Sequence, residues 1–319
     1  KTSLWNRMIT ADASFFVNSI EGKIVTSTTQ YPEYFFTYYP TASFRPYINY
    51  DNDRRMGFDF NVNYNKRFGK VDFTAGVTGT YYTTKATKRD ELHQDKYQYR
   101  KGYAVDGIWG LQCIGFFKDE QDIIDSPEQR LGGTIRPGDL KYVDQNNDGI
   151  IDDKDQVYLA RGGWYGAPLA LGINLTAKWK GLTFFVLGTG EFGGHAMKNN
   201  ESYYWISGED KYSAVVRGRW TPETAATATY PRLTTESGTN NFYSSDFWMY
   251  KTDAFRLAKV QVTYDLPSKW FKNSFVHGVS AYISGSDLLT ISKERKALEL
   301  NVGSSPQCRF YNLGVTATF

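Results

Sequence analysis

The sequence contains no apolar segment long enough to form a membrane-spanning helix. Such a helix requires about 20 consecutive apolar residues, whereas the longest apolar run covers only residues 182–187. If the chain crosses a bilayer, it must therefore do so as β-strands, whose backbone groups pair with those of neighbouring strands.

The sequence also has few cysteines and little net charge. Cys113 and Cys308 are the two cysteines, and they lie far apart without CxxC spacing, which excludes a zinc or dithiol redox motif. An oxidising compartment would permit them to pair. The 37 Lys and Arg residues nearly balance 34 Asp and Glu residues, and the net charge of +3 is too small to indicate nucleic-acid binding.

Catalytic motifs are absent as well. His93, His195 and His277 fall in separate segments, with neither an HExxH motif nor a companion Ser/Asp pattern. The sequence has no Gly-rich phosphate loop, and its carboxylate pairs lack a spacing diagnostic of acid–base catalysis. We therefore predict that the chain is not an enzyme and carries no cofactor for chemistry.

Aromatic residues, in contrast, are abundant. They make up 17% of the chain, with 24 Tyr, 21 Phe and 8 Trp, although the mean hydropathy is polar at -0.50. Amphipathic aromatic side chains favour surfaces where an apolar phase meets water, including the membrane interface. Many gather near the ends of candidate strands, as two interfacial girdles require: Tyr34, Phe35, Phe36, Tyr38, Tyr39, Tyr81, Tyr82, Trp179, Trp270 and Phe271.

Alternation of apolar and polar residues recurs along the chain and predicts β-strands. Val71, Phe73 and Val77, for example, alternate with Asp72 and Thr74. The pattern gives nine candidate strands, near residues 9–17, 23–37, 58–64, 71–78, 171–179, 182–190, 258–264, 279–283 and 311–319. The fold class is therefore all-β and antiparallel.

Connection lengths distinguish a transmembrane barrel from a soluble β-sandwich, since strands of both folds alternate. The candidate strands are joined in turn by short and long links. The short links are 18–22, 66–70, 180–181 and 266–276, and the long ones are 38–55, 84–167, 191–245 and 293–306. Transmembrane barrels have tight turns on one side and long loops on the other, so the pattern favours a transmembrane antiparallel β-barrel.

The odd strand count has two consequences. Single-chain bacterial barrels have an even number of strands, so nine strands cannot close alone and the remaining strands must come from elsewhere. The two ends of the chain should also lie on opposite sides of the membrane. Residues 1–5 lack the charged and apolar regions of a signal peptide, so we expect the true N-terminus to lie upstream.

From residue 137 onward, seven motifs resemble those of the SusC/RagA-type TonB-dependent transporters, which are large outer-membrane importers. In family order they are 137–142 (PGDLKY), 144–153 (DQNNDGIIDD), 220–223 (WTPE), 230–233 (YPRL), 255–260 (FRLAKV) leading into 264–267 (YDLP), 282–290 (YISGSDLLT) and the terminal Phe319. Earlier residues fit more loosely, through 57–60 (GFDF) and 106–108 (DGI). Asp287 replaces the usual Asn, and residues 297–300 (ALEL) replace a usual Asp-Pro-Glu-like stretch.

The resemblance implies that residues 1–319 are the C-terminal part, about nine strands, of a 22-stranded barrel plugged by an N-terminal domain that lies outside this chain. It implies long extracellular loops near 84–167 and 191–245, and places residue 1 in an extracellular loop. It also implies a Gram-negative outer-membrane importer of oligosaccharide or peptide. The implied partners are a SusD-like surface lipoprotein, TonB acting through the missing N-terminal part, the remaining barrel strands and membrane lipid.

Residues 144–155 have the spacing of an EF-hand-like calcium loop, with Gly149 at the turn position. The candidate ligands are Asp144, Asn146, Asp148, the Ile150 carbonyl, Asp152 and Asp155, at positions 1, 3, 5, 7, 9 and 12. Asp155 replaces the usual Glu and so shortens the closing ligand. An Asx-rich solvated turn without metal is the alternative. Since every position is occupied at once, the sequence favours a structural Ca²⁺.

Aromatic residues in or beside the long links are candidate substrate contacts, because aromatic faces can stack on sugars or grip peptide side chains. They are Trp164, Tyr165, Tyr203, Tyr204 and Trp205. Packing within the loops, or a place in the interfacial girdle, is the commoner role for such residues.

Two other functions fit the same residues. One is a passive porin or a surface adhesin barrel, which would lack an upstream plug and TonB-contacting segment. The other is a secreted, calcium-dependent glycan-binding β-sandwich, which would be soluble without detergent.

Overall fold

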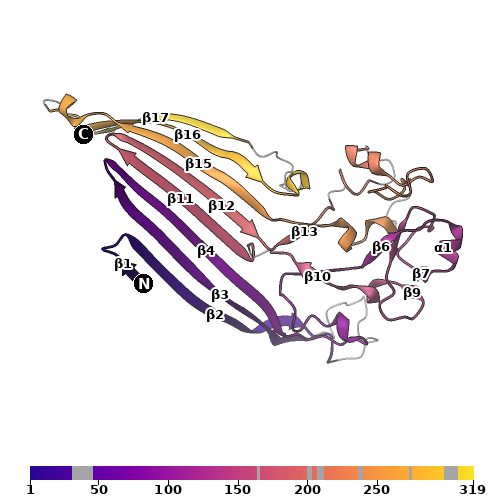
Figure 1. Cartoon of the computed structure of the whole chain (residues 1–319). Helices are drawn as coiled ribbons and strands as arrows, with labels where there is room; N and C mark the ends of the chain where they lie inside the picture. The colour runs from indigo at the N-terminus through magenta and orange to yellow at the C-terminus, as the bar shows by residue number, and fades with distance from the viewer. Residues whose placement is uncertain are drawn as a thin grey trace.

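The regular secondary structure in the computed structural model of the chain is mostly β-strand (Figure 1). It describes residues 1–30, 46–163, 166–199, 203–206, 212–235, 240–272, 275–297 and 308–319. No helix in those ranges is long and apolar enough to cross a membrane.

Nine strands form one antiparallel sheet, in the order β1–β2–β3–β4–β11–β12–β15–β16–β17. Their bounds are β1 (Thr2–Leu4), β2 (Ile9–Thr26), β3 (Tyr47–Phe68), β4 (Val71–Lys88), β11 (Leu169–Trp179), β12 (Leu182–Phe192), β15 (Ala254–Asp265), β16 (Gly278–Ile291) and β17 (Phe310–Thr318). Figure 1 shows the strands side by side, with β1 and β17 at opposite edges. The described sheet is therefore open, as the odd strand count predicts.

The strand count is confirmed, but its composition differs from the prediction at the N-terminal end. The predicted strand 9–17 and residues 23–26 of the predicted strand 23–37 belong to one strand, β2, which ends at residue 26. The predicted link 18–22 therefore lies inside a strand. Gly22 has φ +65° and its N–H donates to Asn52 Oδ1 at 2.9 Å. The pairing register shifts between Ile20 and Lys23. Gly22 therefore forms a β-bulge rather than a turn.

The ninth strand is instead β1, which has three residues. It is joined to β2 through residues 5–8, where Trp5, Asn6 and Arg7 have positive φ. The prediction that the chain ends lie on opposite sides, with residue 1 in an extracellular loop, is wrong. The prediction assumed that the first strand crosses the whole sheet. Instead β1 is only three residues long and lies next to the turn at residues 5–8, so both chain ends lie at the same end of the sheet (Figure 1).

Short and long connections lie at opposite ends of the sheet (Figure 1). The short ones are residues 5–8, 69–70, 180–181 and 266–277, and the long ones are residues 27–46, 89–168, 193–253 and 292–309. We call these ends the short-turn end and the long-connection end. The predicted segregation of link length is thus confirmed, with boundaries shifted by several residues.

Each face of the sheet has one chemical character. A register row across seven strands reads Ala11, Val62, Val77, Ile173, Gly188, Leu257 and Leu289. The row one residue away reads Asp12, Asn61, Thr78, Gly172, Thr189, Arg256 and Thr290. Because side chains alternate between faces, one face is apolar and the other polar. The apolar face is exposed, with Leu313 at 83% and Phe15 at 70%.

The β15–β16 pair also contains a bulge, and Asp287 lies in it with φ +53°. Asn and Asp are the non-glycine residues that best tolerate this left-handed conformation. Asp287 therefore keeps the backbone geometry that Asn would give at the same position.

The long connections contain the remaining short elements. Residues 89–168 hold η2 (Lys96–Gln98), β5 (Gly107–Gly110), β6 (Cys113–Phe116), α1 (Glu120–Ile124), β7 (Glu128–Gln129), β8 (Leu140–Tyr142), β9 (Ile150–Ile151), η3 (Asp153–Asp155) and β10 (Val157–Arg161). Residues 193–253 hold β13 (His195–Met197), η4 (Ala214–Gly218), η5 (Asn240–Phe242), η6 (Asp246–Trp248) and β14 (Met249–Lys251), and η7 (Ser268–Trp270) lies at the short-turn end.

Candidate functional site

The polar face of the sheet carries side chains that hydrogen-bond one another along and across strands. Asn61 Nδ2 donates to Asp12 Oδ1 at 3.2 Å, and Asn63 Nδ2 donates to Asn61 Oδ1 at 3.1 Å. Thr80 Oγ1 donates to Asp59 Oδ1 at 2.7 Å. Transmembrane barrels place such polar side chains on the inside and apolar ones toward lipid.

Gly76 allows two asparagines to approach each other on this face. Asn63, Gly76 and Asn174 are direct neighbours in register on β3, β4 and β11. A Cβ atom at Gly76 would collide with the amide oxygens of both asparagines. The glycine therefore makes room for two polar side chains above β4.

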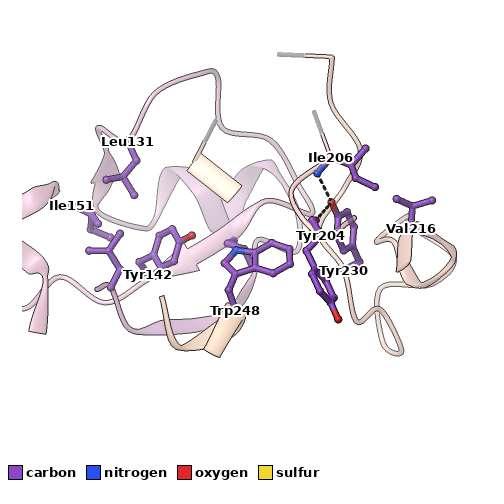
Figure 2. Close-up of a cluster of buried hydrophobic side chains, with 10 residues drawn as sticks. Leu131, Tyr142, Ile151, Tyr204, Ile206, Val216, Tyr230 and Trp248 are labelled. Atoms are coloured by element: carbon purple, nitrogen blue, oxygen red, sulfur yellow. Dashed lines mark hydrogen bonds between the residues drawn. The ribbon is translucent and has the colours of Figure 1, made fainter. Parts of the chain in front are cut away.

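The main hydrophobic core lies between the two longest connections rather than under the sheet (Figure 2). Its members are Leu111, Leu131, Leu140, Tyr142, Ile151, Tyr204, Ile206, Val216, Tyr230 and Trp248, all 8% exposed or less. Residues 89–168 and 193–253 thus fold together as one unit, which we call the connection domain.

Two adjacent, buried asparagines join the halves of this domain. Asn240 Nδ2 donates to the Leu140 carbonyl at 2.7 Å, and Asn240 Oδ1 accepts from Gln129 Nε2 at 2.6 Å. Asn241 Oδ1 accepts from Leu140 N at 2.8 Å, and its Nδ2 donates to Asp139 Oδ1 at 2.8 Å. A buried polar group left unpaired costs about 1–3 kcal/mol, so these bonds fix how the two connections meet.

Three of the sequence motifs come together in the connection domain. Gly138 has φ +90°, and a Cβ atom there would overlap the ring of Trp220. Arg232 Nε lies 2.7 Å from Asp139 Oδ1, and the Arg232 backbone N–H donates to the Gly138 carbonyl at 2.9 Å. These three motifs therefore supply packing contacts between the two connections.

Asp106 attaches the connection domain to the sheet. The side chain is fully buried, and its Oδ1 accepts from Thr84 Oγ1 at 2.7 Å. Arg161 Nε lies 3.0 Å from Asp106 Oδ2, and Arg161 Nη1 donates to the Tyr82 carbonyl at 2.5 Å. Because Thr84 and Tyr82 belong to β4, one ion pair fixes β10 against the end of that strand.

The candidate calcium ligands are hydrogen-bonded to the backbone of their own loop. Asp144 accepts from the N–H groups of Asn147 and Gly149 at 2.7 and 2.9 Å. Asp155 accepts from the N–H groups of Gln145 and Asp152, each at 2.8 Å. The side chains of Asn146, Asp148 and Asp152 accept in the same way from Asp148, Ile150 and Lys154. Backbone donors therefore already hold the loop in shape.

Asp155 is the buried member of this loop, with 0% exposure. Burial, joined by the charges of Asp144 and Asp152, raises the pKa of its carboxyl despite two backbone hydrogen bonds. Among the residues that the structure describes, no three His, Cys, Asp or Glu side chains converge closely enough to hold a metal ion. A calcium ion would have to draw its ligands together, and the site stays a prediction.

The candidate aromatic contacts fall into two groups. Trp164 and Tyr165 lie outside the described residues. Tyr204 is 7% exposed and belongs to the core, while Tyr203 and Trp205 pack against it. The Tyr203 and Tyr204 rings meet edge to face at 4.8 Å between centroids. The described rings thus pack within the connection domain, and substrate contact by any of the five stays a prediction.

The two cysteines are thiols in the structure. Burial raises the pKa of Cys113 to about 11. A thiol with so high a pKa is almost entirely protonated at neutral pH and is a poor nucleophile, which gives Cys113 a packing role in β6.

An open sheet with an exposed apolar face and a hydrogen-bonded polar face has the two-sided character of a transmembrane β-barrel wall. No protein-family model matches the chain. The TonB-dependent receptor P26 of Formosa agariphila is 29% identical over an alignment of 242 residues, which covers 68% of this chain and 23% of that protein.

Solved structures share the fold. A chain of the RagAB peptide importer in its open-open state matches with a TM-score of 0.73 at 17% identity, over 99% of this chain and 33% of that one. The RagAB peptide transporter matches with a TM-score of 0.67 at 16% identity, over 92% and 30%. The chain thus spans a third or less of the proteins it matches. The chain is therefore similar in sequence to a TonB-dependent receptor, and its fold matches part of the RagAB importer chains.

Proposed function

We propose that the chain forms part of the wall and the outer connections of an energised importer in a Gram-negative outer membrane. The observation that carries this proposal is the two-faced sheet, whose apolar face suits lipid and whose polar face suits a water-filled interior. The relatives are named as a TonB-dependent receptor and a peptide importer, which supports energised import over a passive porin. We assign the chain no catalytic step.

The imported substrate is an oligosaccharide or a peptide, captured with a SusD-like surface lipoprotein. TonB acts through an N-terminal plug, which together with the remaining strands completes the barrel. The connection domain lies at the long-connection end and would be extracellular, since transmembrane barrels place long loops outside. Its packed core makes it a rigid rim on which substrate and partner can dock.

We propose that the loop of residues 144–155 is a structural calcium site within this rim. The spacing of its oxygen ligands and the φ of +81° at Gly149 fit an EF-hand-like turn. The buried Asp155 carboxylate, surrounded by other acids, would gain most from a cation. The ion would stiffen the loop and take part in no reaction.

Energy-dependent uptake tests the importer. Cells lacking the gene, and the same cells complemented with the full-length gene, are fed a polysaccharide hydrolysate or a casein hydrolysate, and oligomers lost from the medium are measured by mass spectrometry. We expect depletion only with the gene and only without a protonophore, because TonB needs inner-membrane energy. Uptake that survives the protonophore would show a passive porin, and a protein soluble without detergent would show a sandwich.

A further inference from the structure

Two rows of aromatic residues border the exposed apolar face of the sheet. A register row at the short-turn end contains Phe68, Trp179 and Tyr264. A second register row, toward the long-connection end, contains Phe15, Phe58 and Tyr81. Aromatic rings in such positions are typical of the two interfaces between a membrane and water. The two rows therefore mark the limits of the apolar band.

The distance between the two rows matches the thickness of a membrane. On β4 the rows pass through Val71 and Tyr81. These positions differ in depth by about 24 Å, at a rise of about 3.4 Å per residue and a strand tilt of about 45°. The apolar band of a transmembrane barrel is about 25 Å tall. Positions that follow Tyr81 on β4 therefore lie at the level of the lipid headgroups.

Three strands continue past the aromatic row at Tyr81. β11 begins at Leu169, which pairs with Tyr81, whereas β2, β3 and β4 extend further toward the connection domain (Figure 1). On this extension Ser19 pairs with Arg54, and Arg54 pairs with Lys85. Lys85 lies an even number of positions from Tyr81, and directly paired residues share a face, so these three side chains lie on the apolar face. All three are exposed.

The cations on the two faces of this extension differ in their partners. On the polar face, the Asp53 carboxylate pairs with both Lys23 and Arg89. On the apolar face, Arg54 and Lys85 form no ion pair or side-chain hydrogen bond within the part of the chain that the structure describes. Like charges directly opposite each other destabilise a sheet. A bound anion would remove the repulsion between Arg54 and Lys85.

The chemistry of this row suits a phosphate group. The planar guanidinium of Arg54 matches two phosphate oxygens, and the Lys85 ammonium adds a point charge. The Cβ atoms of directly opposite residues lie about 4.5–5.5 Å apart, so both cations can reach one phosphate. The Ser19 hydroxyl is a further donor in the same row. Glu21, in the bulge at Gly22, pairs with neither cation within the described ranges.

We propose that Arg54 and Lys85 bind a phosphate group of a glycolipid in the outer leaflet, with the Ser19 hydroxyl as a further donor. The inference rests on the proposed function, which places the long-connection end outside the cell in a Gram-negative outer membrane. The outer leaflet of such a membrane consists mainly of phosphorylated glycolipid. Because the row lies on the lipid side of the sheet, its ligand is a lipid and not the imported substrate.

The test is titration of the full-length protein in detergent, followed by native mass spectrometry, with three lipid probes. They are diphosphoryl lipid A, the same lipid A with both phosphates removed, and phosphatidylglycerol. We expect diphosphoryl lipid A to bind about tenfold or more tightly than the dephosphorylated form, because hydrogen bonds to ionised groups are about twice as strong as neutral ones. Phosphatidylglycerol should bind less tightly than diphosphoryl lipid A, since a phosphodiester carries less charge than a phosphomonoester. Added salt should weaken diphosphoryl lipid A selectively.

Variants assign the effect to this row. Arg54→Gln combined with Lys85→Gln should lower affinity for diphosphoryl lipid A about tenfold and leave affinity for the dephosphorylated form unchanged, which also shows that the variant is folded. Arg54→Lys combined with Lys85→Arg keeps both charges and should keep most of the selectivity. Arg67→Gln combined with Lys178→Gln is the matched control, because these residues flank Asp72 in a register row on the polar face at the short-turn end.

Several results would overturn the inference. They are equal affinity for diphosphoryl and dephosphorylated lipid A, no binding of either, and full selectivity in the variant that carries Gln at both positions. Phosphatidylglycerol that binds as tightly as diphosphoryl lipid A would also overturn the assignment to a glycolipid. A parent protein without phosphate preference would leave Arg54 and Lys85 to an acidic surface of a partner protein.

The outcomes separate this inference from the import function. Protonophore-sensitive uptake together with equal affinity for the two forms of lipid A would keep the importer and remove the phosphate site. Phosphate-selective binding that depends on Arg54 and Lys85, without energy-dependent uptake, would keep the site and remove the importer.

Discussion

Arg161 Nε lies 3.1 and 3.0 Å from the two carboxylate oxygens of Asp106, and the bonds from this pair to Thr84 and Tyr82 of β4 join the connection domain to the sheet. The acid is 0% exposed and the arginine 13%. Exposed ion pairs contribute little to folding stability because water screens them. A buried pair is different, because breaking it is strongly destabilising. Removal of one partner leaves the other charge buried and unpaired.

We predict that Asp106→Ala loosens the connection domain from β4. Breaking a buried pair costs about 3–5 kcal/mol, and Thr84 and Gly163 lose acceptors as well. Limited proteolysis of intact outer membranes should cut residues 89–168 faster in the variant. Asp72→Ala is the control, because its pair with Arg67 is 61% and 70% exposed. Equal cleavage rates in the two variants would contradict the anchoring role of Asp106.

A second prediction concerns Gly138, whose φ of +90° and contact with Trp220 both exclude a side chain. Gly138→Ala should destabilise the connection domain by the left-handed strain of about 1–2 kcal/mol and by overpacking of about 1–3 kcal/mol. Hydrogen exchange of the backbone amides of β8 measures the loss.

Gly102→Ala separates the two contributions. Gly102 has φ +98°, but no atom lies within 4 Å of the position that a Cβ atom would take, so its substitution adds strain without a clash. We expect Gly102→Ala to lose less hydrogen-exchange protection than Gly138→Ala. If the two variants lose equal protection in their own segments, the Trp220 contact contributes nothing beyond backbone strain.

The wall of the barrel could be predicted from sequence because its signal is local. Val71, Phe73 and Val77 alternate within a few residues, and the structure places them in β4 on the apolar face. The continuity of β2 could not be predicted, since Gly22 suits a turn and a bulge equally well by local criteria. The partner strand β3 determines that Gly22 forms a bulge, because Gly22 N donates a hydrogen bond to Asn52 on that strand.

The connection domain has no such local signal. Leu111 and Trp248 belong to one core but come from different connections, and no periodic pattern marks either of them. The sequence motifs include Gly138 and Trp220, but a motif does not show that these two residues contact each other. The buried Asn240 and Asn241 carried no sign of their role, because an Asn–Asn pair usually indicates an exposed turn.

A third prediction concerns calcium at residues 144–155. Asp144→Ala combined with Asp148→Ala removes two carboxylates from ligand positions, so bound metal should fall and the loop should exchange faster. Glu120→Ala combined with Asp153→Ala removes the same charge from non-ligand positions and should leave both unchanged. Metal analysis after dialysis against calcium checks this. A parent protein without an ion under calcium excess would show that the backbone hydrogen bonds of Asp144 and Asp155 suffice.

The last prediction concerns Phe319, whose ring stacks on Phe275 with centroids 5.7 Å apart and planes 10° from parallel. Phe319 follows β17, where Tyr311, Leu313 and Val315 occupy the exposed apolar face. A terminal strand of this pattern, ending in an aromatic residue, resembles the signal by which barrels are inserted.

We therefore expect Phe319→Asp to lower the amount of protein in the outer membrane severalfold, because a charge replaces a ring 72% exposed at the interface between apolar and aqueous phases. Phe319→Trp should preserve the yield, since it keeps an aromatic ring at the interface. Phe275→Ala removes the stacking partner and leaves the terminus intact. If Phe275→Ala lowers the yield as much as Phe319→Asp, the ring pair rather than the terminal residue is what assembly requires.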